Sequence, residues 1–218
     1  MDNETRRSPA RINPANRWQQ DNHHPDTSIM TESLEQFLAN KFTCTENEIS
    51  DVVSYFRPIN TIKDEILVEN GHVCRYLFFI VKGSVKAYFI DSNGQETIRY
   101  VAFENQFISS IHSFIKQTPS NEYISAIEPS ELLVITYADF KSALSKSSLF
   151  KDFYIRMLEG TYLNNHWRIE TFLRLDAKQR YEYLLKNNKQ LVQRLSNKNL
   201  SSFLGVTQES LSRIKAKK

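Results

Sequence analysis

The sequence predicts an α+β protein in which an antiparallel β jelly-roll barrel with flanking helices precedes a long helix and a C-terminal helical module. The apolar spacing is helical up to residue 56, alternates as in strands from residue 59, and becomes helical again from residue 137. Turn signals containing Gly, Pro and Asn separate the strand-like runs, which is typical of antiparallel sheets. With 218 residues, 40% of them apolar, the chain is long enough for one large or two small domains.

The N-terminal segment divides into a polar part and a helical part. Residues 1–29 are rich in Pro, Asn and Arg and offer little to bury, so we expect a disordered extension. Residues 31–56 have helical spacing that ends before Pro58. The apolar positions are Leu34, Phe37, Leu38, Phe42, Ile49, Val52, Val53 and Phe56. We therefore begin the folded barrel domain at residue 30 and end it at residue 146.

Seven β-rich runs are expected in this domain. They are Ile59–Ile62, Glu65–Val68, Tyr76–Val81, Val85–Ile90, Thr97–Phe103, Tyr123–Ile127 and Leu132–Ile135. The clearest hairpin signal is Asn93-Gly94, because this pair accepts the two positive φ angles of a type I′ turn.

A short helix (138–145) and a long helix (147–173) are expected next. The long helix has more apolar positions than one buried stripe requires, so we expect it to pack on its twin in a homodimer. The candidate interface residues are Phe150, Phe153, Tyr154, Met157 and Leu158. The alternative is burial against its own barrel alone. Residues 174–218 follow, with short helices expected over Ala177–Leu185, Lys189–Leu195, Asn199–Leu204 and Gln208–Lys215.

Charge separates this last part from the rest. Residues 174–218 hold eleven Lys or Arg against three Asp or Glu, a net charge of +8, although the whole chain is only +3. Since residues 1–29 balance, residues 30–173 carry −5. An acidic sensor joined to a basic module indicates a phosphate-bearing partner. The chain has no apolar run of membrane-spanning length and no secretory leader, and its two cysteines form no CxxC motif. We expect a cytoplasmic protein with no membrane association.

The most informative motif is Leu200–Ile214. A helix ends at Leu204, Gly205 supplies the sharp turn that favours positive φ, and Thr207 can cap a second helix with polar outward positions. This is the helix-turn-helix pattern that presents a recognition helix to the major groove of DNA. An ordinary helical hairpin is the alternative.

The order of barrel, long helix and basic helix-turn-helix resembles the Crp/Fnr family of bacterial transcription regulators over about residues 31–215. The specific motifs are residues 76–86, YLFFIVKGSVK, and the Leu204-Gly205-Val206-Thr207 turn followed by Leu211-Ser212-Arg213-Ile214. The amino-acid sequence of these motifs is most similar to that of regulators from Bacteroidetes, which often end soon after the recognition helix. The resemblance implies a homodimer on double-stranded DNA, an effector in the barrel, and RNA polymerase as a further partner.

The resemblance also indicates how the recognition helix contacts DNA. It implies that the bases are contacted by Gln208, Glu209 and Arg213, whose side chains suit adenine, cytosine and guanine respectively. Glu209 has an equal alternative as a capping-type carboxylate early in the helix. Phosphate contacts or helix capping fall to Thr207 and Ser212, and phosphate charge to Lys198 and Lys215.

The effector site departs from the family pattern. Cyclic-nucleotide binders carry a Gly-Glu pair for the ribose and an Arg-Ser or Arg-Thr pair for the phosphate, where this chain has Ser109-Ser110 and Ser120-Asn121. A buried phosphate without a cationic partner keeps its desolvation penalty, so we expect an effector other than cyclic AMP or a loss of ligand binding. The candidate pocket residues are Ser109, Ser110, Ser120, Asn121 and Tyr123; plain loop and strand residues are the alternative.

Two other function classes compete. A cupin-type enzyme needs a His-x-His pair on a barrel strand, where this chain has apolar residues 76–80. The second is a ligand-binding barrel whose helical tail contacts proteins. We expect no catalytic residues, no metal, and no cofactor.

Overall fold

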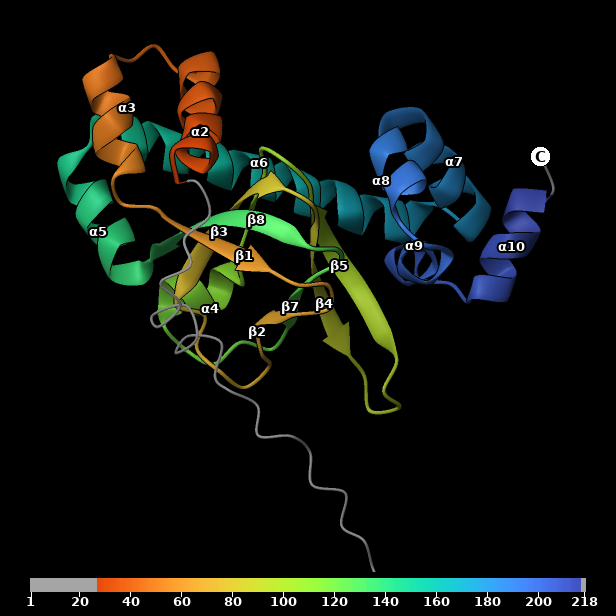
Figure 1. The fold of residues 1–218 in the computed structure, drawn as a ribbon. Helices are drawn as coiled ribbons and strands as arrows, with labels where there is room; N and C mark the ends of the chain where they lie inside the picture. Colours follow the sequence, from red (N-terminus) through yellow and green to blue (C-terminus); the bar gives the residue numbers. More distant parts are fainter. Residues whose placement is uncertain (1–26, 217–218) are drawn as a thin grey trace, which may run out of the picture.

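The computed structural model describes residues 27–216 (Figure 1). Two helices precede the strands: α2 (Thr27–Lys41) and α3 (Glu46–Val53). The strands are β1 (Arg57–Thr61), β2 (Ile66–Val68), β3 (Tyr76–Lys82), β4 (Val85–Ile90), β5 (Glu96–Ala102), β6 (Phe107–Ile108), β7 (Tyr123–Ala126) and β8 (Ser130–Thr136). The remaining helices are α4 (Ile111–Lys116), α5 (Tyr137–Lys146), α6 (Ser148–Arg174), α7 (Ala177–Asn187), α8 (Lys189–Arg194), α9 (Asn197–Leu204) and α10 (Gln208–Ala216).

The strands form two four-stranded sheets, in the orders β1-β8-β3-β6 and β2-β7-β4-β5. All pairings are antiparallel, as predicted, and the order is that of a two-sheet jelly roll. The apolar run of β3 lies between β8 and β6, and Leu77, Phe78, Phe79 and Ile80 are fully buried there. A continuous apolar run is what a central strand buried on both faces requires.

The hairpin between β4 and β5 differs from the prediction. Five residues separate β4 from β5, and the hydrogen bond from Asp91 N–H to the Gln95 carbonyl closes a turn of three residues rather than two; within it Gly94 N–H donates to the Asp91 carbonyl. Only Gly94 has positive φ (+78°), whereas a type I′ turn needs a second one at Asn93. The Asp91 carboxylate accepts from the N–H groups of Asn93 and Gln95, which stabilises the longer turn.

The N-terminal helical segment is divided into two helices by a capping motif. Thr45 and Glu48 form a capping box, in which each side chain accepts from the other residue's backbone N–H, so a second helix starts after Thr45. The predicted disorder of residues 1–29 is wrong for residues 27–29, which open α2; the rest of that prediction lies outside the described residues. Short elements β6 and α4 were not predicted, since two strand residues and a six-residue helix carry no readable period.

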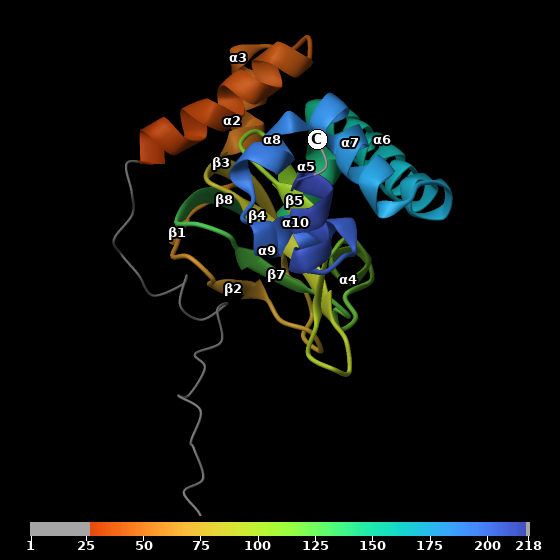
Figure 2. The same ribbon diagram turned by 90° about the vertical axis from the view of Figure 1, so that its right-hand side faces the viewer.

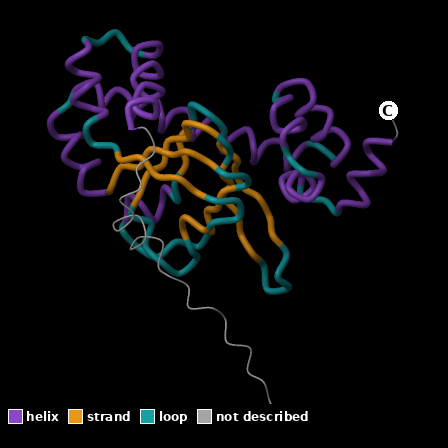
Figure 3. The backbone as a smooth tube through the Cα atoms, in the orientation of Figure 1, coloured by secondary structure: helices purple, strands orange, loops and turns teal. Residues whose placement is uncertain are grey.

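Helix α6 connects the sheets to the C-terminal helices, as Figures 1 and 2 show. Figure 3 shows α7 to α10 gathered as one helical group at the far end of α6. This group shares a hydrophobic cluster with the sheet, because Ile98 and Val101 of β5 pack with Leu200 and Phe203 of α9. None of the described helices is long and apolar enough to cross a membrane.

Candidate nucleic-acid interface and sensor cavity

Helices α9 and α10 meet at Gly205 in a sharp turn. Gly205 has a left-handed backbone conformation (φ +68°, ψ +41°), and its N–H donates to the carbonyls of Ser201 and Ser202, which caps α9. A Cβ at this position would lie 2.9 Å from Cε1 of Phe172 on α6, so space as well as φ requires glycine. Thr207 Oγ1 accepts from Ser210 N–H at 3.2 Å and caps α10. These contacts fix the direction of α10.

Helix α10 has an inner and an outer face. Leu211 is fully buried and Ile214 packs against the same cluster, whereas Gln208, Ser212 and Arg213 are exposed. Glu209 is also exposed, and hydrogen bonds from its own backbone N–H and from Thr207 lower the pKa of its carboxyl. This carboxylate therefore also serves the helix start, as the capping alternative requires.

The flanking cations differ in availability. Lys198 of α9 is exposed, but Lys215 is half-buried and its Nζ donates to Asn197 Oδ1 at 2.6 Å. Phosphate contact by Lys215 would compete with this bond. The predicted DNA-contacting residues thus lie on α9, on α10 and in the turn between them, with Thr207 and Glu209 partly engaged in capping.

Arg194, at the end of α8, joins this unit to the sheets. Its guanidinium donates to both carboxylate oxygens of Glu104 (2.5 and 3.0 Å) and to Glu128 Oε1 at 2.7 Å. The two acceptors are themselves held by the β3–β4 turn, since Gly83 N–H donates to Glu104 and Ser84 Oγ to Glu128. Sequence reasoning missed this cluster, because its members are 66 and 90 residues from Arg194. Part of the positive charge of residues 174–218 therefore holds the C-terminal helices against the sheets.

Two further contacts fix α9 against β5. Ser202 Oγ donates to the Glu96 carbonyl at 2.7 Å and accepts from Ile98 N–H at 3.0 Å. Arg168 of α6 donates to the carbonyls of Ile98 and Phe203 and lies over the Phe203 ring at 4.0 Å. Burial, with repulsion from neighbouring arginines, lowers the pKa of Arg168 to about 10, so the group stays charged at neutral pH. Sensor and C-terminal helices are thus one hydrogen-bonded assembly.

A cavity of about 480 Å³ lies between α2, the β5–β6 segment and α6. Its volume is within the range of ligand-binding pockets. The residues lining it are Phe37, Lys41, Phe42, Leu77, Arg99, Tyr100, Asn105, Gln106, Phe107, Ile108, Ser109, Ile111, Phe153, Arg156, Met157, Gly160, Thr161, Asn164 and Asn165.

The predicted pocket residues do not line this cavity, apart from Ser109. Ser120 Oγ donates to Ser110 Oγ at 2.9 Å and to the Glu122 carbonyl, so these buried hydroxyls stabilise the loop around α4. Asn121 is exposed. Tyr123 stacks on the Tyr88 ring at 5.4 Å. These contacts favour the alternative of plain loop and strand residues for four of the five, and their assignment to an effector pocket stays a prediction.

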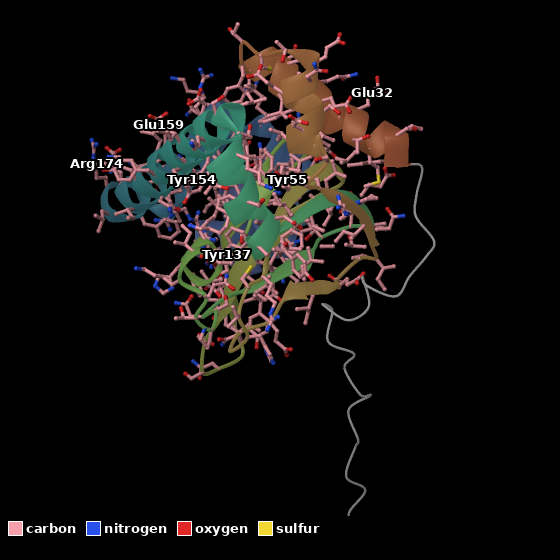
Figure 4. All side chains as sticks on the ribbon, turned by 90° about the vertical axis from the view of Figure 1, so that its left-hand side faces the viewer. Glu32, Tyr55, Tyr137, Tyr154, Glu159 and Arg174 are labelled. Atoms are coloured by element: carbon pink, nitrogen blue, oxygen red, sulfur yellow. The ribbon has the colours of Figure 1, made fainter. Side chains whose placement is uncertain are left out.

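Of the predicted interface residues on α6, Phe150 and Phe153 are unavailable to a partner because they are buried in their own chain, whereas the prediction for Tyr154, Met157 and Leu158 stays untested. Phe150 and Phe153 are 0% and 3% exposed in the core of their own chain, and Tyr154 packs on Phe140 at 5.1 Å. Met157 lines the cavity, and Leu158 is half-buried. The exposed apolar residues of α6 are Ile155 (53%), Tyr162 (69%), Leu163 (64%), Ile169 (60%), Phe172 (39%) and Leu173 (81%), and among them Ile155, Tyr162 and Ile169 are spaced by seven residues. Figure 4 places Glu159 and Arg174 on the side of α6 that faces away from the sheets.

Histidines and cysteines form no metal site within the described part of the chain. Across residues 27–216, no group of three or more His, Cys, Asp or Glu side chains could hold a metal ion.

Comparison with known proteins identifies the sheet domain. Residues 60–147 match the cyclic nucleotide-binding domain family. No curated protein sequence matches the chain.

Solved structures share the fold over most of the chain. FixK2 from Bradyrhizobium japonicum has a TM-score of 0.64 at 17% identity, covering 74% of this chain and 83% of its own. The c-di-GMP-responsive global regulator CLP from Xanthomonas campestris has a TM-score of 0.65 at 16% identity, covering 79% and 91%. A protein from Eubacterium rectale assigned to the Crp/Fnr family of transcriptional regulators has a TM-score of 0.62 at 15% identity, covering 83% and 85%. The chain thus matches the cyclic nucleotide-binding domain family over residues 60–147 and shares the fold of these solved regulators.

Proposed function

We propose that the protein is a homodimeric, sequence-specific DNA-binding transcription regulator whose sheet domain senses an effector other than cyclic AMP. The observation that carries this proposal is the set of exposed polar side chains on α10. Gln208, Ser212 and Arg213 are all exposed on a helix that is anchored to its own chain through the buried Leu211. A short helix held rigidly by its base with free polar side chains outward is the arrangement that reads base edges.

The charge distribution supports a nucleic-acid partner. Residues 174–218 have a net charge of +8, and the three cations Lys186, Lys189 and Lys198 are exposed on α7, α8 and α9. Neutralising phosphates with such side chains releases counterions, which supplies sequence-independent affinity. Arg213 then adds selectivity, because its guanidinium suits the O6 and N7 acceptors of guanine.

The exposed stripe of α6 supports the homodimer. Ile155, Tyr162 and Ile169 follow a seven-residue repeat, which is the spacing with which two helices pack along a shared seam. Leu173, 81% exposed, extends the stripe by one more turn. A two-fold dimer would present its two α10 helices to successive major grooves of a near-palindromic site, about 34 Å apart.

The local electrostatics disfavour cyclic AMP. Arg99, near the serine-rich loop of residues 109–120, is neutralised by Glu122, whose oxygens lie 2.7 and 3.1 Å from its nitrogens. Glu122 is buried, so a cyclic phosphate beside it would meet a like charge in place of a free cation. The sensed effector therefore has another chemistry. The expected contact with RNA polymerase and the cytoplasmic location stay predictions.

The test is a selection of bound sequences from random double-stranded DNA, followed by affinity measurements over a range of salt concentrations. We expect an enriched near-palindrome and an affinity that falls linearly on a log–log plot against salt. Absence of any enriched sequence would overturn the proposal.

An Arg213→Ala variant locates the reading face. Loss of one bidentate base contact costs about 1–3 kcal/mol and relaxes the preference at one base position. Lys178→Ala is the matched control, because Lys178 is a surface cation of α7 that pairs with Glu182. Equal losses in both variants would show that only charge matters.

A further inference from the structure

We propose that the cavity between α2, the β5–β6 segment and α6 binds a small organic carboxylate with an apolar aliphatic or aromatic body. The binding of this molecule is argued from the cavity alone. Its role as the effector also rests on the proposed function. The proposal stands on the composition of the walls, on the cations at one side, and on a helix position that leaves the cavity open.

The walls are largely aromatic. Phe107 packs against Phe37 of α2 at 5.8 Å and against Phe153 of α6 at 4.8 Å, so all three layers contribute to one apolar surface. Phe42 and Leu77 extend it. Such a surface binds a hydrocarbon or aromatic skeleton by removing its area from water. A strongly polar ligand would leave most of this lining without a partner.

The charged residues that line the cavity are all positive. Lys41, Arg99 and Arg156 line the cavity, and no Asp or Glu side chain does so among the described residues. Arg99 is already paired with Glu122. Lys41 and Arg156 have no carboxylate partner within residues 27–216, which leaves two uncompensated cations beside an apolar pocket. An anionic group on the ligand would complete this arrangement.

Arg156 is positioned by neighbours that leave its charge free. Its Nη1 donates to the Lys41 carbonyl at 2.7 Å, and the guanidinium lies over the Phe42 ring at 4.6 Å. Lys41 Nζ lies 5.9 Å from the centre of the Phe37 ring. Stacking on aromatic rings orients the cations without neutralising them, and the remaining donors of the guanidinium fork suit a carboxylate.

Gly160 keeps the cavity open. It stands in the middle of α6 on the cavity side, where glycine costs about 0.5–1 kcal/mol relative to alanine. A Cβ there would meet nothing within 4 Å, so packing against a neighbour does not explain the residue. The missing side chain leaves space between Met157 and Asn164, one turn to either side.

The cavity is adjacent to the contact that holds the C-terminal helices. Asn105 and Gln106 line it, and the residue before them, Glu104, binds Arg194. A ligand that moves this segment changes the geometry of the Glu104–Arg194 pair. This adjacency gives the bound carboxylate a route to α10.

The experiment is isothermal titration of the full chain with sodium decanoate and with 1-naphthoate, which separate an aliphatic from an aromatic body. Decanol is the uncharged control ligand, and cyclic AMP and cyclic di-GMP are tested in parallel. We expect at least one carboxylate to bind, with decanol about tenfold or more weaker because it lacks the charge-assisted bonds. Equal binding of decanol, or preferred binding of either nucleotide, overturns the proposal.

Variants place the site. Arg156→Gln should weaken carboxylate binding about tenfold, whereas Arg174→Gln, a cation on the outer end of the same helix, should leave it unchanged. Gly160→Phe should abolish binding by filling the cavity, with circular dichroism confirming that the helix remains. Unchanged binding in Arg156→Gln overturns the assignment. If a carboxylate binds but leaves the DNA affinity unchanged, the effector role is overturned. The DNA affinity of Arg213→Ala, measured without carboxylate, tests the recognition helix independently.

Discussion

Arg194 and Glu104 form a two-bond ion pair between α8 and the β5–β6 segment of the sheet domain. Because Glu104 is also held by Gly83 N–H, the arginine binds a carboxylate whose position is already fixed. Little side-chain entropy is then lost when the pair forms, so it contributes more than an ordinary surface ion pair.

Replacing Arg194 with Ala should therefore loosen α8 and α9 from the sheets. We expect a loss of about 1.5–3 kcal/mol in unfolding free energy and faster amide hydrogen exchange in α9. Lys189→Ala is the matched control, because this residue is an exposed cation on the same helix. Equal unfolding midpoints and exchange rates in the two variants would contradict the docking role.

The same pair predicts a pH dependence. Burial raises the pKa of the Glu104 carboxyl, but hydrogen bonds from Arg194 and Gly83 outweigh this and bring the pKa below its ordinary value of 4.5. A carboxyl with a lower pKa in the folded state stabilises the fold above its unfolded-state pKa and loses this effect as pH falls through the folded value. The difference in unfolding free energy between wild type and Glu104→Gln should stay constant above pH 4.5 and shrink below it. Urea titrations at several pH values measure it; a difference that grows on acidification would be inconsistent with the pair.

Two glycine substitutions should have opposite signs. Gly205→Ala places a side chain at positive φ and 2.9 Å from Phe172, so we expect a loss of about 1–2 kcal/mol or more. Gly160→Ala lies in a helix with nothing within 4 Å, so we expect a gain of about 0.5–1 kcal/mol. Thermal unfolding of both variants checks this, and destabilisation by Gly160→Ala would show that the cavity wall is tighter than its geometry indicates.

The exposed stripe of α6 should control the oligomeric state. Tyr162→Glu buries a charge in the proposed seam and should yield monomers by light scattering. Ile115→Glu in α4 provides a control, because Ile115 is a partly exposed apolar residue away from α6. A Tyr162→Glu protein that elutes with the same mass as wild type would exclude this stripe as the interface.

Periodic elements were predictable from the sequence, and non-local contacts were not. The long strands and α6 repeat their apolar positions often enough to be read, and Gly205 has the positive φ that its turn position predicts. The capping box at Thr45 was readable too, and would have divided the N-terminal helical segment.

The cavity depends on residues that no local pattern connects. Arg156 meets the Lys41 carbonyl across 115 residues of sequence, and only the folded chain brings them together. The burial of Phe150 and Phe153 in their own chain was missed for the same reason, because the sequence does not show which surface covers an apolar position of a helix. The serine-rich loop was correctly expected to lack a free arginine, but Glu122 and its pairing with Arg99 were missed.

Helix α6 is one element with two working faces. Gly160 and Met157 face the cavity, while Ile155, Tyr162 and Ile169 face away from it. If the outer face meets a second copy, each cavity lies roughly one helix diameter, about 10 Å, from the seam between subunits. Occupation of one cavity would then shift a wall that both subunits share, so the response to ligand should be steeper than that of two independent sites.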